Sequence, residues 1–303
     1  MTQQKTMSGS AWSQLILLAF IWGGVFLAMR IALDEIGPLT AVMHRCGWAM
    51  LVLWAIVLIR GLPIPKDPKV WASFLIMGVL NNVLPFFLLA WSQVHIESGL
   101  TAIFNSFTAV FGVVVAAIVF ADEKLTARKA MGVVLGVIGV SVAMGISALQ
   151  HLDLRSLAQL AAIAATACYA LAGSFARVRL SHLPPMVAAA GMLTGATIVL
   201  VPAAWLIEGQ PTLMLEGRTW LAISYFSLIA TGVAFLLYYS ILAKAGAGNL
   251  MLVTLLMVPI AILLGHFVLG EVLLPRHLYG FGVIALGLVV LDGRVFKRLR
   301  PGP

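Results

Sequence analysis

The chain has 303 residues, of which 62% are hydrophobic and only 10% are charged, and its formal net charge is +8. A soluble globular domain carries about 25% charged residues, so this composition excludes a water-soluble fold and makes the lipid bilayer the expected surrounding. Basic residues at the ends of membrane helices account for the positive charge, so no nucleic-acid partner is expected.

Ten apolar segments follow one another along the chain, and each approaches the length of about 20 residues that a helix needs to cross a bilayer. A membrane β-barrel would instead alternate apolar and polar residues over segments of about 10 residues. The first segment is too long for the core of a signal peptide and has no clear cleavage site after it. The expected spanning helices cover residues 11–31, 39–60, 69–92, 98–120, 126–147, 155–178, 185–207, 219–242, 248–269 and 275–292.

The second half of the chain repeats the first. When Phe87–Val140 is moved forward by 148 positions, it aligns with Phe235–Leu288 without a gap, and 10 of the 54 pairs are identical. The identities fall at equivalent points of the hydropathy profile; Glu123, for example, is matched by Glu271. This pattern indicates an internal duplication.

Lys and Arg are distributed unevenly along the chain. With a cytoplasmic N-terminus, 14 of the 19 lie on the inner side, four lie on the outer side, and Arg45 lies within a helix. This bias predicts that both termini are cytoplasmic, in a bacterial-type inner (plasma) membrane. Each half has an odd number of helices, so residues 1–150 and 151–303 are expected to form two inverted five-helix repeats. The predicted fold is therefore an all-α integral membrane protein with ten transmembrane helices, an arrangement typical of secondary transporters.

A Glu-x-Leu motif closes the fourth span and again the ninth, and a glycine-rich helix follows each copy. The motifs are Glu123-Lys124-Leu125 before Gly132, Gly136 and Gly139, and Glu271-Val272-Leu273 before Gly280, Gly282 and Gly287, together with Trp22-Gly23-Gly24 in the first span and Pro38 and Arg45 around the second. Over nearly the whole chain this pattern resembles the drug/metabolite transporter superfamily, EamA type. That family often has a proline in the middle of both the fourth and the ninth helix. Here the ninth helix has Pro259, but the corresponding position of the fourth helix holds Phe111.

The resemblance implies ten helices in a five-plus-five inverted repeat and the export of amino acids or related small metabolites. The amino-acid exporter branch, aromatic amino-acid exporters included, is the most similar. An exporter of drugs or of other metabolites such as nucleosides is the alternative, and a channel or a membrane enzyme is less favoured.

All eleven acidic residues lie at the ends of the predicted helices or between them. Ion-coupled carriers often use a carboxylate within the membrane, so we expect no carboxylate to be indispensable through protonation. The chain has no G-x-x-x-x-G-K-[ST] motif for ATP and no metal-ligand spacing, so no cofactor and no metal are expected. Glu123 and Glu271 are expected to anchor helix ends, and the protein is expected to be a monomer or a weak homodimer.

Neutral polar and aromatic side chains occupy the middle of several predicted helices at similar depth. Pro85 lacks the N–H that would bond the carbonyl of Asn81, and a free carbonyl at membrane depth is tolerated only against protein or a water-filled cavity. A small-molecule substrate is therefore expected to bind in a midplane cavity between the halves. The predicted lining residues are Trp22, Asn81, Asn82, Phe104, Asn105, Thr108, Tyr169, Thr231, Tyr238, Thr254 and Met257. Packing or hydrogen bonding between helices is the alternative role for each of them.

Arg45 in the second span has several possible roles. It is placed to attract a substrate carboxylate, to extend to the membrane surface, or to pair with Asp34 or Glu35, and a structural role is favoured. The predicted cavity lining then contains no fixed charge, so it is expected to accept several neutral amino acids with weak discrimination.

Overall fold

A computed structural model describes residues 7–96, 98–145, 156–269 and 272–292, and all regular secondary structure in these ranges is helical. Eight helical segments are long and apolar enough to cross a membrane, and two further apolar helices, Ile103–Val119 and Pro275–Leu291, are shorter. The ten predicted spans are thereby confirmed, with boundaries that agree to within three residues.

Several spans consist of more than one element. In chain order the ten spans are α1 (Gly9–Gly23) with α2 (Val25–Leu33); α3 (Pro38–Ile59); α4 (Pro68–Gly78), η1 (Val79–Val83) and α5 (Leu84–His95); α6 (Ser98–Val119); α7 (Ala127–Met144); α8 (Leu157–Arg179); α9 (Pro185–Glu208); α10 (Gly217–Ser224), η3 (Tyr225–Val233) and α11 (Ala234–Ala245); α12 (Ala247–Leu250) with α13 (Val253–Leu269); and α14 (Pro275–Asp292).

Local sequence signals determine where several of these helices begin. The Ser8 hydroxyl accepts a hydrogen bond from the backbone N–H of Ala11, and the Thr126 hydroxyl accepts one from Lys129, so each serves as an N-terminal cap. Proline occupies the first position of α3, α4 and α9, where its missing N–H is not needed for helical hydrogen bonds.

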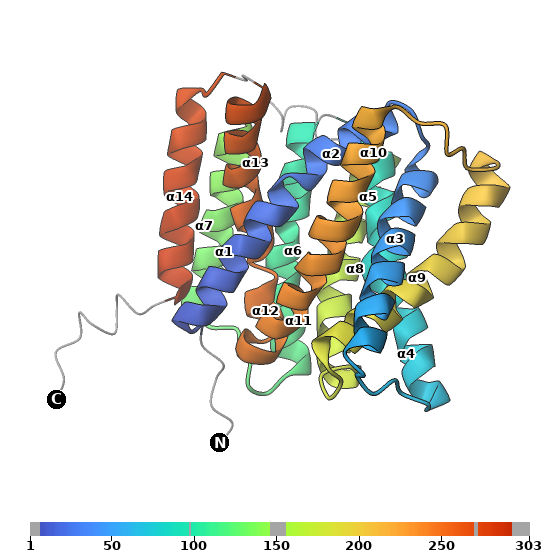
Figure 1. The fold of residues 1–303 in the computed structure, drawn as a ribbon. Coiled ribbons are helices and arrows are strands. Elements are labelled where there is room, and N and C mark those ends of the chain that lie inside the picture. Colours follow the sequence, from blue (N-terminus) through green and yellow to red (C-terminus); the bar gives the residue numbers. More distant parts are fainter. Residues whose placement is uncertain (1–6, 97, 146–155, 270–271, 293–303) are drawn as a thin grey trace.

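The two halves run in opposite directions through the bundle. Figure 1 shows that α1 begins and α14 ends at the same end, which we call the terminal end; the other end is the far end. Each half crosses the bundle five times, an odd number, so the second half starts at the opposite end from the first. As a result, α1 runs toward the far end while its counterpart α8 runs toward the terminal end. The contacts follow the duplication: the fourth span (α6) packs on the sixth (α8), and the ninth (α13) packs on the first (α1).

The fifth and tenth spans, α7 and α14, lie side by side at the edge of the bundle (Figure 1), and their glycine-rich faces meet each other within one chain. A Cβ atom built on Gly132 would lie 2.7 Å from the carbonyl oxygen of Gly287 and 2.9 Å from the backbone nitrogen of Leu291. Backbone atoms cannot turn aside as a flexible side chain can, so glycine is required for this close approach.

We expect a Gly132→Val substitution to destabilise the protein by about 1–3 kcal/mol, because the added side chain meets backbone atoms of α14. The measurement is the midpoint of thermal unfolding in detergent. Gly282→Val in α14 is the matched control, because a Cβ atom at Gly282 meets no atom within 4 Å. Equal midpoints for the two variants would contradict the packing described here.

Candidate functional site

A cavity lies between the two halves, and its wall draws on seven of the ten spans. The sequence predicts contributions from the first, third, fourth, sixth, eighth and ninth spans, and the structure adds the second through Arg45. Eight of the predicted lining residues stand in this wall. They are Trp22, Asn81, Asn105, Thr108, Tyr169, Tyr238, Thr254 and Met257. The wall also includes apolar residues that the sequence did not single out, Phe26, Phe86 and Phe235 among them.

Two of the other predicted residues, Asn82 and Phe104, lie outside the wall, and in each case the adjacent residue of the helix lines the cavity instead. Adjacent residues of a helix face different directions, so Asn81 takes the place in the wall while the amide of Asn82 points to the Cys46 sulfur, at 4.0 Å. In the same way Asn105 lines the cavity, and Phe104 packs in a separate apolar cluster with Leu89 and two alanines of α8.

Thr231 is the third predicted residue outside the wall, and it supports Arg45 instead. Its hydroxyl donates to the Phe226 carbonyl oxygen at 2.7 Å and accepts a hydrogen bond from Nε of Arg45 at 2.9 Å. Both groups are buried. Thr231 therefore holds the guanidinium in a fixed orientation.

Wide helical turns occur at equivalent places in the third and eighth spans. In η1 the Leu84 N–H bonds to the carbonyl of Val79, five residues back, next to the proline that removes the regular bond. In η3 the Ala234 N–H reaches back five residues to Ile229. Such π-type segments change which carbonyls are available, and they are frequent at functional sites.

The first and eighth spans are joined by two reciprocal hydrogen bonds beside the cavity. The indole N–H of Trp22 donates to the carbonyl of Ala230 at 2.9 Å, and the Tyr225 hydroxyl donates to the carbonyl of Ile21 at 2.7 Å. The first span is interrupted at Gly24, where an added Cβ would lie 2.5 Å from the Tyr225 hydroxyl. The Trp-Gly-Gly sequence thus allows the eighth span to approach the first closely.

Arg45 differs most from the sequence-based expectation. Its side chain does not extend to the surface, because the residue is only 7% exposed, and its guanidinium carbon lies 3.7 Å from the centroid of the Phe86 ring. Within the described ranges, no carboxylate lies within ion-pair distance of Arg45. The carboxylate of Glu35 instead accepts the backbone N–H of Glu216 at 3.1 Å. Two of the roles open to Arg45, extension to the membrane surface and pairing with Asp34 or Glu35, are therefore wrong, and so is the expectation of a cavity wall without a fixed charge.

Two hydroxyl groups in the wall have no hydrogen-bond partner among the described residues. They belong to Thr108 and Tyr238, and both side chains are buried. Arg45 lies seven residues from the far-end start of α3, and Tyr238 lies seven residues before α11 ends at the terminal end. The backbone positions of Arg45 and Tyr238 are thus on opposite sides of the midplane.

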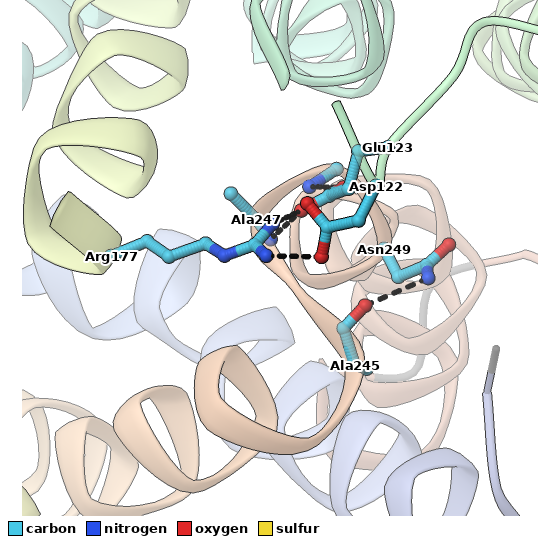
Figure 2. A network of polar contacts seen from close by, with 7 residues as sticks. Asp122, Glu123, Arg177, Ala245, Ala247 and Asn249 are labelled. Atoms are coloured by element: carbon cyan, nitrogen blue, oxygen red, sulfur yellow. Dashed lines mark hydrogen bonds and ion pairs between the residues drawn. The ribbon is translucent and has the colours of Figure 1, made fainter. Parts of the chain in front are cut away.

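A buried carboxylate joins the two halves at the terminal end. Figure 2 shows Glu123, in the connection between α6 and α7, with the Arg177 guanidinium from the end of α8. Glu123 also accepts the backbone N–H groups of Ala247 and Gly248 at the start of α12, each at 2.9 Å. Asp122 binds the other guanidinium nitrogen. The prediction that Glu123 anchors helix ends is confirmed, whereas Glu271 lies outside the described residues.

The chain has sequence relatives that match over most of its length. An uncharacterized transporter from Archaeoglobus fulgidus is 25% identical over 92% of this chain and 98% of its own length. A protein named as a probable terminal-alkyne amino-acid exporter, from Streptantibioticus cattleyicolor, is 23% identical over 97% of each chain. A crystal structure with 18% sequence identity superposes with a TM-score of 0.79 over 93% of this chain and 98% of that chain, which supports the fold.

The profile of the EamA-like transporter family matches twice, at residues 10–145 and at residues 156–291. The two matches follow the duplication read from the sequence, and together they cover nearly the whole chain. The resemblance read from the sequence motifs is thereby confirmed. The chain belongs to the EamA-like transporter family.

Proposed function

We propose that the protein is a secondary transporter that exports amino acids or related small metabolites by alternating access. The observation that carries the proposal is the cavity between two inverted repeats in a transporter family, because inverted-repeat carriers bind substrate at the repeat interface near the midplane. The name of the relative from Streptantibioticus cattleyicolor, a probable amino-acid exporter, supports amino acids as the first class to test.

In this mechanism the two five-helix repeats, residues 1–150 and 151–303, rock against each other around the substrate. The wall supplies neutral hydrogen-bonding groups from Asn81, Asn105 and Thr108, and aromatic faces from Trp22 and Tyr169. The Glu123–Arg177 contact joins the two repeats at the terminal end, so it has to separate when the cavity opens there.

The test is transport by the purified protein in liposomes, with a panel of amino acids and nucleosides, with and without a pH gradient. Saturable exchange of at least one amino acid is the expected result. A flux that does not saturate would indicate a channel, and exchange of nucleosides alone would favour the alternative substrate class.

We further propose a bacterial-type inner membrane location with the terminal end of the bundle in the cytoplasm. Lys66 is exposed in the connection between α3 and α4, and Gln210 is exposed in the connection between α9 and α10. These two connections lie at opposite ends of the bundle (Figure 1). In a background that lacks the native Cys46 and Cys168, we expect cysteine at position 66 to be labelled only from the cytoplasm and cysteine at position 210 only from outside. Labelling of both from the same side would contradict the inverted arrangement.

A further inference from the structure

We propose that the cavity selects by charge, and that its preferred ligand is a monoanionic carboxylate with an apolar body rather than the zwitterionic amino acid of the same skeleton. This proposal rests on the proposed function, because it selects, among the amino acids and related small metabolites named there, those that bind the same cavity most tightly. The juxtaposition that carries it is a buried guanidinium in a cavity wall whose described residues include no carboxylate.

Arg45 supplies a permanent positive charge, because a guanidinium does not lose its proton in proteins. A buried charge without an opposite charge beside it is unfavourable, so a bound anion at Arg45 would be stabilised. One guanidinium nitrogen, Nε, is used by Thr231, and the Phe86 ring covers one face of the group. Among the described residues, none accepts a hydrogen bond from the two terminal nitrogens, which can bind the two oxygens of one carboxylate.

The described residues of the wall offer no opposite charge to an ammonium group. The wall's described residues include no aspartate and no glutamate, and Glu123 lies outside it in the terminal-end network. An α-amino group sits on the carbon next to the carboxylate, so binding the carboxylate at Arg45 brings the ammonium close to the guanidinium. Two like charges then repel each other in a medium of low dielectric constant, which weakens binding of the zwitterion.

The rest of the wall fits an apolar body with one neutral polar substituent. Phe26, Phe235 and Met257 are apolar, and Trp22 lies near Tyr238 with 6.4 Å between ring centroids. The hydroxyls of Thr108 and Tyr238, which have no partner among the described residues, can bond a hydroxyl, keto or amide group of the ligand. The predicted class is therefore an aromatic or branched aliphatic monocarboxylate whose amine is absent or acylated.

Three probes with the same phenyl skeleton test the proposal on the unmodified protein. The probes are 3-phenylpropionate, phenylalanine and 2-phenylethylamine, which are anionic, zwitterionic and cationic, and calorimetry in detergent gives their dissociation constants. We expect 3-phenylpropionate to bind about tenfold or more tightly than phenylalanine, and phenylethylamine to show no saturable binding. Phenylalanine binding as tightly as 3-phenylpropionate, or no saturable binding of 3-phenylpropionate, overturns the proposal.

Substitutions then assign the preference to Arg45. We expect Arg45→Gln to weaken 3-phenylpropionate binding about 10- to 100-fold and to remove its advantage over phenylalanine, because a charge-assisted hydrogen bond is lost. Arg45→Lys keeps the charge and should keep the order of the probes. The matched control is Arg60→Gln, at the exposed end of the same helix, with unchanged affinities expected. An unchanged order of the probes in Arg45→Gln overturns the assignment.

Transport measurements separate this proposal from the proposed function. If phenylalanine is exchanged in liposomes and the three probes bind equally, selection by charge is wrong and the transporter function stands. If 3-phenylpropionate binds in the expected order but neither compound is exchanged, selection by charge stands and the transporter function is wrong.

Discussion

Replacement of Glu123 by alanine is expected to destabilise the protein by about 3–5 kcal/mol, because it breaks a buried ion pair from one side. The Glu123 side chain is 1% exposed and the Arg177 side chain is 15% exposed, so water cannot easily replace the lost carboxylate. The substitution also leaves the N–H groups of Ala247 and Gly248 without their acceptor. The measurement is the free energy of unfolding in detergent, from a denaturant titration.

Glu216→Ala is the matched control. The Glu216 carboxylate also binds an arginine, Arg218, but the two side chains are 62% and 63% exposed. An exposed pair contributes only about 0–1 kcal/mol, so the control should change little. A Glu123→Ala variant as stable as Glu216→Ala would show that the network does not hold the terminal end together.

Glu123→Gln tests whether the same residue couples transport to protons. Glu123 lies in the connection between α6 and α7 and does not line the cavity, so we expect the ratio of transport with and without a pH gradient to match that of the unmodified protein. A variant that binds substrate and loses only the pH-driven part of transport would give Glu123 a protonation role.

Hydropathy was sufficient to predict the spans because each apolar run is bounded by charges, proline or glycine. Hydropathy alone did not predict where the α-helical pattern is interrupted inside a span. Pro85 signals the wide turn of η1, but the equivalent position of the eighth span holds Val233, which gives no such signal. There, contacts from elsewhere in the chain stabilise η3: Trp22 bonds to Ala230, 208 residues away.

Depth in the membrane predicted much of the cavity wall, because side chains near the middle of helices from both repeats meet there. The direction of each side chain around its helix could not be predicted in the same way, which is why Asn82 and Phe104 lie outside the wall. The nearby membrane surface and the acidic residues Asp34 and Glu35 both favour a structural role for Arg45. Its hydrogen-bond partner Thr231 is 186 residues away, in the other repeat.

Replacement of Trp22 by alanine is expected to lower transport at subsaturating substrate by about 10- to 100-fold, because it removes a large ring from the cavity wall and leaves the Ala230 carbonyl without its donor. Trp22→Phe keeps an aromatic ring and loses only the N–H group, so its rate should lie between those of the alanine variant and the unmodified protein.

Trp71 offers a matched control, because its indole also donates to a backbone carbonyl, that of Pro65, but outside the cavity wall. With equal amounts of protein in the liposomes, Trp71→Ala should transport normally. A Trp22→Phe rate equal to that of Trp22→Ala would place the whole effect in the hydrogen bond, and a normal Trp22→Ala rate would place the substrate elsewhere.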